Sequence, residues 1–305
     1  MTRAATSART TRPGCRPGRR SRGSALPLAW RRRLHLGLLL SGPLGWLAVA
    51  YLGSLVVLFI SAFWQLDEFS GQIVKQPTFD NFRLLWENHV YRTIALRTIG
   101  IAALVTVTDA ILAFPIAFFM AKVASRRVRG LLIVGVLMPL WASYLVKVYA
   151  WREILSEDGI LNWALSPLGI KGPGFGFVAT WLVFSYLWLP YMILPIYAGL
   201  ERIPDSLLDA SGDLGAGAAK TFRRVVLPMA LPAVVAGSIF TFSLTLGDYI
   251  TPQIVSSTQF IGNVVYNNVG VANNLPLAAA FATVPVVIMI AYLLIARRLG
   301  AFDSL

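Results

Sequence analysis

The sequence has few of the residues from which catalytic and metal sites are usually built. Cys15 is the only cysteine, which excludes a disulfide framework. The two histidines, His35 and His89, cannot form a metal site or a nucleophile–base pair with a single cysteine. The sequence therefore predicts no catalytic residue, no metal ion and no cofactor.

Charged residues are also scarce, at 13% of the chain against about 25% in soluble domains. Hydrophobic residues reach 56%, more than one water-facing globule of 305 residues would readily bury. The net charge of +13 does not indicate nucleic acid, because ten of the 27 basic residues precede Leu34. Residues 1–33 lack apolar periodicity and are expected to form a disordered basic tail. Arginines beside a membrane span suit anionic lipid as a partner.

Six segments are nearly free of charge and long enough to cross a bilayer. They are residues 34–66, 98–121, 130–146, 172–200, 225–247 and 275–296. Backbone groups in lipid must bond within their own helix, and the alternation typical of strands is not evident. The predicted fold class is therefore all-α, a polytopic membrane protein with six transmembrane helices in a single domain over residues 34–305.

The connections between these segments predict an orientation. With the N-terminus in the cytoplasm, 20 of the 27 Lys and Arg residues fall on the cytoplasmic side, so both termini are expected there. Residues 64–91, on the outer side, mix aromatic and charged side chains as an interfacial helix does. Residues 149–177 are predicted to form a short helix followed by a turn.

The predicted cytoplasmic connection at residues 201–228 has the most specific pattern. Pro204 suits a first helical turn, and Gly215 and Gly217 interrupt the helix that follows. The residues sharing one face of that helix are Leu207, Ala210, Ser211 and Leu214. An apolar face on a charged loop is expected to be buried, either against the chain's own helix bundle or against another protein.

This connection resembles the Glu-Ala-Ala loop in the membrane subunits of bacterial ABC importers. The family pattern is Glu-Ala-Ala, three residues, Gly, nine residues, Ile, one residue and Leu-Pro. Here the spacing is kept, with Asp in place of Glu and Ser in place of the second Ala, at Asp209, Ala210, Ser211, Gly215, Leu227 and Pro228. The resemblance implies a type I ABC importer permease in the bacterial inner membrane, with residues 201–228 as the loop that couples it to an ATPase subunit.

Other stretches resemble one branch, the first permease subunit of spermidine/putrescine importers. They are residues 138–155, 189–204, 246–255 and 261–265. No Gly-x4-Gly-Lys-Ser/Thr run is present, so ATP hydrolysis is expected in a separate subunit. The resemblance implies polyamine import with two ATPase subunits, a second related permease and an extracytoplasmic binding protein. The alternatives are another cargo, such as an amino acid or iron chelate, or a single-component secondary transporter.

Polar and aromatic residues in or near the spans are candidates for the substrate path. An ionisable residue inside a span is a functional-site candidate, and aromatic faces and carboxylates bind alkylammonium ions. The candidates are Asp109, Trp141, Tyr144, Tyr149, Asp248 and Tyr249. Each has a plain structural alternative: a buried carboxyl paired with a hydroxyl such as Thr106, an interfacial aromatic belt, or a turn residue.

Overall fold

The computed structural model describes residues 39–67 and 69–298. The tail predicted for residues 1–33 lies outside this part of the chain. The chain divides into two compact units, with the boundary between Leu55 and Val56. The second unit holds every candidate site residue.

Five helices within the described residues are long and apolar enough to cross a membrane. They are Leu39–Ser61, His89–Val123, Phe177–Glu201, Ala218–Gly247 and Leu275–Arg298. A sixth crossing is formed if the bent pair Arg126–Trp141 and Tyr144–Leu168 counts as one span. The predicted all-α, polytopic membrane fold is therefore confirmed.

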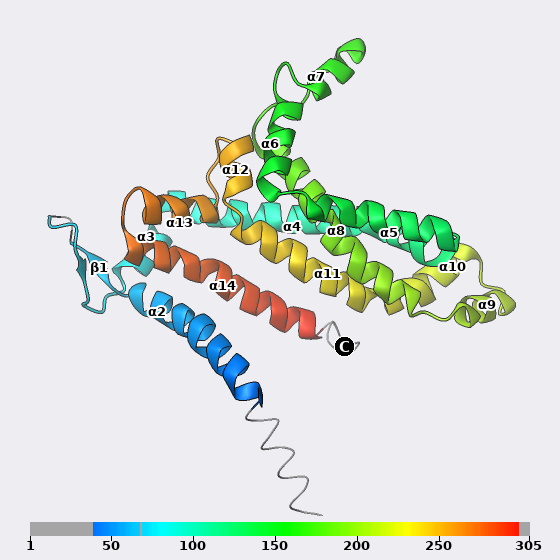
Figure 1. The fold of residues 1–305 in the computed structure, drawn as a ribbon, viewed down its shortest axis with the longest axis horizontal. Coiled ribbons are helices and arrows are strands. Elements are labelled where there is room, and N and C mark those ends of the chain that lie inside the picture. The colour runs from blue at the N-terminus through cyan, green and yellow to red at the C-terminus, as the bar shows by residue number, and fades with distance from the viewer. Residues whose placement is uncertain (1–38, 68, 299–305) are drawn as a thin grey trace, which may run out of the picture. The chain divides into compact units, whose positions relative to one another are not determined.

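Figure 1 labels the elements of the second unit and the helix that leads into it. The long helices are α4 (His89–Phe118), α5 (Arg126–Trp141), α8 (Phe177–Glu201), α11 (Leu227–Gly247) and α14 (Leu275–Arg298). The span Leu39–Ser61 ends in the π-helical turn η1 (Ala48–Leu52) followed by α2 (Gly53–Ser61). Two further π-turns extend long helices: η2 (Phe119–Val123) continues α4, and η4 (Phe222–Val226) joins α10 (Ala218–Thr221) to α11. The other elements are β1 (Gln65–Leu66), β2 (Ile73–Val74), α3 (Asp80–Glu87), α6 (Tyr144–Leu155), α7 (Ile160–Leu165), η3 (Ser166–Leu168), α9 (Asp205–Asp213), α12 (Ile250–Val255) and α13 (Ile261–Gly270).

The third predicted span is broken rather than straight. Residues 130–146 read as one run, but α5 ends at Trp141 and α6 leaves it at 94°. Ala142 is extended, with ψ of 143°, and Ser143, with ψ of 136°, is the N-cap residue of α6, so neither residue continues the helix. An apolar run without charge does not reveal such a break, because both halves satisfy the same hydropathy pattern.

The interfacial helix predicted for residues 64–91 is partly wrong. Strands β1 and β2 pair antiparallel in register Gln65↔Val74, and only the later part of the segment is helical, as α3. Asp67 closes the turn by accepting from the Ser70 hydroxyl at 2.6 Å. Gly71 has φ of 66°, which suits glycine. Residues 149–177 do contain the predicted short helix, α7.

The core of the second unit is built where α4, α8 and α11 lie side by side (Figure 1). Small residues allow this approach, as is common between membrane helices. A Cβ atom on Gly199 of α8 would lie 2.4 Å from the Ala233 side chain of α11. One on Gly237 of α11 would lie 2.8 Å from the Met192 sulfur of α8. The two helices therefore touch with almost no side chain between them.

Candidate functional site

The connection at residues 201–228 folds as the predicted helix, glycine turn and second helix. Helix α9 begins at Asp205, directly after Pro204. The chain leaves α9 through Gly215, whose φ of 73° lies in the left-handed region. A side chain is strained there, whereas glycine is not. From Ala218 the helix continues without a break into α11.

Most of the predicted apolar face of α9 is exposed. The side chain that packs into the cluster of buried residues containing Ile203 and Val226 is Leu208, which is not a member of that face. Ser211 is half-buried, with its hydroxyl 2.8 Å from that of Thr221 on α10. The other members of the face, together with the acid that precedes Ala210, are exposed: Leu207, Asp209, Ala210 and Leu214. At 87% exposed, Leu214 has almost no cover from the chain itself.

The end of the loop lines a shallow cavity beside η4. Leu227 is 38% exposed and contributes to a cavity of about 650 Å³ together with Phe118 and Phe222. Pro228 is the second residue of α11 and directly follows the π-helical turn η4. The six residues of the resembling pattern thus lie on one continuous helix–turn–helix segment.

At the opposite end of α11, Asp248 and Tyr144 come together from distant parts of the sequence. The Tyr144 hydroxyl, on α6, donates to the Asp248 carboxylate. The Tyr144 ring stacks on Trp188 of α8, with centroids 6.0 Å apart and planes at 16°. Thr251 joins the cluster with its hydroxyl 2.6 Å from that of Tyr144. We call Asp248, Tyr144, Trp188 and Thr251 the acid–aromatic cluster.

The carboxylate of Asp248 is fully engaged. One oxygen accepts from the backbone N–H groups of Ile250 at 2.8 Å and Thr251 at 3.2 Å. The other accepts from the hydroxyls of Tyr144 and Thr251. A carboxylate has about four acceptor positions, so none remains open. Asp248 therefore caps α12 as well as contributing negative charge, and its burial raises its pKa above the ordinary value.

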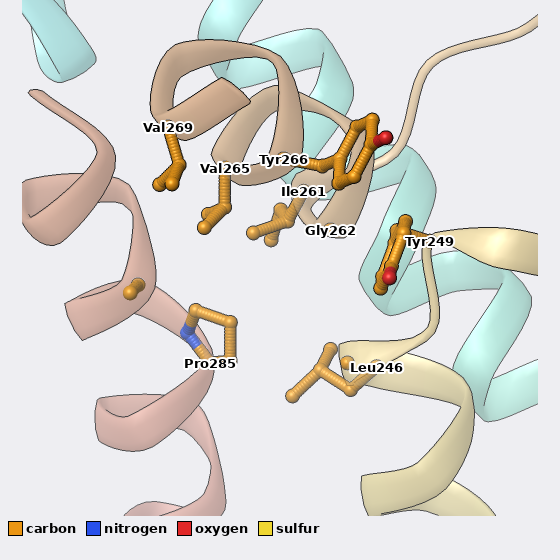
Figure 2. A pocket seen from close by; sticks show the side chains of 10 residues that line it. Leu246, Tyr249, Ile261, Gly262, Val265, Tyr266, Val269 and Pro285 are labelled. Atoms are coloured by element: carbon orange, nitrogen blue, oxygen red, sulfur yellow. The ribbon is translucent and has the colours of Figure 1, made fainter. Parts of the chain in front are cut away.

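Tyr249 lines a different, apolar cavity of about 380 Å³ (Figure 2). Its ring stacks on Tyr266 of α13, with centroids 4.8 Å apart. Val265 and Pro285 line the same cavity. Gly262 sits close to the loop, since a Cβ there would lie 2.8 Å from the Asp248 carbonyl oxygen. Glycine at this position lets α13 hold the Asp248–Tyr249 turn in place.

Asp109 lies in the middle of α4 with no exposed surface. Neither of its carboxylate oxygens has a hydrogen-bond partner among the described residues. Thr106, a candidate partner from the sequence, instead donates to the Ala102 carbonyl at 2.7 Å. Ser185 on α8 is its polar neighbour. The Ser185 hydroxyl and the Trp188 indole N–H are likewise buried without partners in this part of the chain.

The two remaining aromatic candidates lie outside these groups. Trp141 is 90% exposed at the end of α5, and Tyr149 is 50% exposed on α6. Such positions suit a lipid interface or a neighbouring subunit. Trp188 and Thr251, by contrast, belong to the acid–aromatic cluster and were not predicted as site residues. The Asp-x-x-Thr spacing at 248–251 is a local capping signal that points to Thr251, whereas no local signal singles out Trp188.

The fold is similar to that of a chain in a solved ABC transporter. It is similar to a solved chain from the bacterial alginate ABC transporter in complex with an alginate pentasaccharide-bound periplasmic protein, with a TM-score of 0.71. The match covers 90% of this chain and 96% of that one, at 16% identity. At this identity the likeness establishes the fold and nothing further.

The sequence comparisons give the family. Residues 103–302 match the family described as binding-protein-dependent transport system inner membrane component. The inner membrane ABC transporter permease protein YdcU of Escherichia coli (strain K12) is 45% identical, over 95% of this chain and 97% of that protein. The spermidine/putrescine transport system permease protein PotB of Haemophilus influenzae is 29% identical, over 67% of this chain and 72% of that protein. The chain therefore belongs to this family of ABC importer permeases, as its loop motif indicated, and is a multi-pass membrane protein.

Proposed function

We propose that this permease translocates a polyamine such as spermidine or putrescine. The proposal is supported by the similarity to PotB, whose name states that cargo. It is also supported by the chemistry of the second unit, which brings carboxyl groups and aromatic faces together on helices that pack against one another. A polyamine carries several ammonium groups on an apolar chain, and these are the groups that carboxylates and aromatic faces bind.

One observation carries this proposal: the carboxyl group of Asp109 is completely buried and has no partner among the described residues. An unpaired polar group in hydrocarbon is unfavourable, so such a residue marks a functional position. When the transport cycle separates α4 from α8, Asp109 presents an acceptor to an ammonium group. Trp188 lies three residues after Ser185, the polar neighbour of Asp109, on α8, and supplies an aromatic face.

The partners follow from the two ends of the spans. The exposed side of α9, with Leu207, Asp209, Ala210 and Leu214, docks on an ATPase subunit, and two copies of that subunit serve the complete importer. Hydrolysis of ATP takes place in those subunits and not in this chain. A second, related permease covers the other exposed helix faces. An extracytoplasmic binding protein delivers the polyamine at the α12 end.

The proposed topology puts α9 and both termini in the cytoplasm of a bacterium. Residues 1–33 then form a basic tail against the anionic lipid of the inner membrane. Residues 34–305 form a single permease domain, and residues 201–228 are its coupling loop. With the opposite topology, α9 would lie on the outer side of the membrane, where it could not contact a cytoplasmic ATPase subunit.

The test is ATPase stimulation in the reconstituted importer. The complete complex is supplied with its binding protein, loaded in turn with spermidine, putrescine, an amino acid or an iron chelate. Stimulation by spermidine or putrescine alone is the expected result. Stimulation only by a non-polyamine cargo would refute the substrate proposal, and absence of a retained ATPase subunit in mild detergent would refute the coupling loop.

A further inference from the structure

Lys122 ties the start of α9 to the end of the α4 helix. Its ammonium group donates to the Ile203 carbonyl at 2.5 Å and to the Asp205 carboxylate at 2.7 Å. These two residues flank Pro204, where the chain passes from α8 into α9. The Lys122 side chain is 9% exposed, whereas that of Asp205 is 80% exposed. The ion pair therefore reaches from a buried cation to the surface of the coupling helix.

Burial of the Lys122 side chain makes its contacts with Ile203 and Asp205 unfavourable to break. An ammonium group has three donors and is heavily penalised when buried without partners. Ile203 and Asp205 satisfy it from one side of the junction. The nearby ammonium holds the pKa of Asp205 below its usual value, so the carboxylate is ionised at neutral pH. Breaking the contact would leave a buried charge only partly compensated.

Arg129 braces the same corner from α5. Its guanidinium donates to the carbonyls of Met120 and Ala121, at 2.9 Å and 3.0 Å, in η2. It also contacts the Glu201 carboxylate at the end of α8, at 3.4 Å. The carbonyls at the end of a helix have no helical donor, and here Arg129 supplies one. The segment that carries Lys122 is thus fixed to both neighbouring helices.

A second tether leads from α9 to α11. The hydroxyls of Ser211 and Thr221 lie 2.8 Å apart and join α9 to α10, and α10 continues through η4 into α11. The coupling helix is therefore fastened to two spans. One, α4, carries Asp109 thirteen residues before Lys122, about 20 Å along the helix at 1.5 Å per residue. The other leads to Asp248.

We infer that Lys122 is a positioning residue that converts movement of α9 into movement of α4 during the transport cycle. This inference rests on the proposed docking of α9 on an ATPase subunit. A rigid helix transmits a displacement along its axis only if the contact at its end is not broken by that displacement. Lys122 makes that contact through two bonds on either side of Pro204, so a shift of α9 pulls directly on the span that contains Asp109.

The test measures cargo transported per ATP hydrolysed in proteoliposomes containing the complete importer. Lys122→Met keeps the length and the apolar stem of the side chain but removes its donors. We expect transport per ATP to fall by about tenfold, the effect of losing one strong charge-assisted contact. Asp205→Asn, at an exposed position, should retain the Ile203 bond and lower the ratio by about twofold to threefold. Lys171→Met is the matched control, since Lys171 is an exposed lysine outside residues 201–228, and should leave the ratio unchanged.

Co-purification of the ATPase subunit with each variant separates this inference from the function on which it rests. If the wild-type permease does not retain the ATPase subunit, the docking proposal fails. If Lys122→Met retains the subunit and transports with the wild-type ratio, the positioning role is refuted. If Lys122→Met does not assemble, Asp205→Asn decides: an unchanged ratio refutes the inference and a lowered ratio supports it.

Discussion

Asp248 has all of its acceptor positions occupied, whereas Asp109 has none occupied among the described residues. Both are aspartates in or near spans, and the sequence alone makes both of them candidates for the substrate path. The structure shows that Asp248 caps α12, while Asp109 has no local structural task. At the scale of single residues, the two acids should therefore respond differently to the loss of charge.

Asp109→Asn removes the ionisable carboxyl group at the middle of α4 and keeps the shape of the side chain. We expect polyamine uptake to fall by about tenfold, since a charge-assisted contact to an ammonium group is lost. Assembly should be retained, because Asp109 forms no hydrogen bond among the described residues that its amide would break. Uptake by the reconstituted complex is the measurement.

The control variant is Ser243→Ala, because Ser243 is half-buried on α11. Thr108→Val is not a suitable control, because the Thr108 hydroxyl accepts a hydrogen bond from the Trp181 indole N–H. Uptake at the wild-type rate in Asp109→Asn would contradict the proposed role.

Asp248 should produce a pH dependence of uptake. Burial raises its pKa, so it loses its negative charge at a higher pH than an exposed aspartate does. Uptake of a cation should therefore decline as the medium at the α12 end is acidified from about pH 7.5 to about pH 4.5. Asp248→Asn should transport less at neutral pH and lack this decline. Asp158→Asn, at an exposed position, should behave as wild type. If uptake by Asp248→Asn still declined on acidification, the decline would be caused by a group other than Asp248.

At the scale of elements, the coupling loop shows what a local pattern can predict. The glycine turn, the start of α9 after Pro204 and the positive φ at Gly215 all follow from short-range backbone preferences, which depend on neighbouring residues. The bend between α5 and α6 was not predictable, because it falls inside the charge-free run of residues 130–146, where hydropathy does not change at the bend. The β1–β2 hairpin was missed for a related reason: two-residue strands carry almost no periodic signal.

Gly215→Val should weaken the docking helix without disturbing the spans. A β-branched residue in the left-handed region is strained by about 1 to 2 kcal/mol. A Cβ atom at Gly215 would have no neighbour within 4 Å, so the backbone conformation alone causes the effect. We expect less ATPase subunit to co-purify with the variant and transport to fall with it.

Gly215→Asn and Gly212→Ala are the matched controls for that substitution. Asparagine tolerates the left-handed region better than other residues. Gly212 lies within α9 with open space around it and an ordinary φ, so alanine should be accepted there. If Gly215→Val retained the ATPase subunit as fully as both controls do, the turn would have no part in coupling.

At the scale of the whole molecule, the helical and membrane-spanning nature of the apolar segments could be predicted because hydrocarbon excludes charge along each span. The acid–aromatic cluster could not. Tyr144 and Asp248 are 104 positions apart and meet only because α6 turns sharply from α5. Likewise, the contact of Lys122 with Asp205 spans 83 positions. Packing of distant helices creates these pairs, and a single sequence carries no local trace of them.

The topology can be tested with single cysteines in a Cys15→Ser background. Ser125, the N-cap residue of α5, and Ser206, in α9, are exposed, and Ser70 is exposed in the β1–β2 turn. Cysteines at Ser125 and Ser206 should react with a membrane-impermeant thiol reagent only when the cytoplasmic side is open. A cysteine at Ser70 should react in intact cells. Labelling of Ser125→Cys in intact cells would invert the proposed orientation.

The most direct test of the account is uptake of radiolabelled spermidine by proteoliposomes that contain the complete importer, its binding protein outside and ATP inside. The account predicts accumulation that requires ATP, the binding protein and an intact α9, and that a non-hydrolysable ATP analogue abolishes. Uptake that persists without ATP or the ATPase subunit would contradict it, as would ATP-driven uptake of a different solute with spermidine excluded.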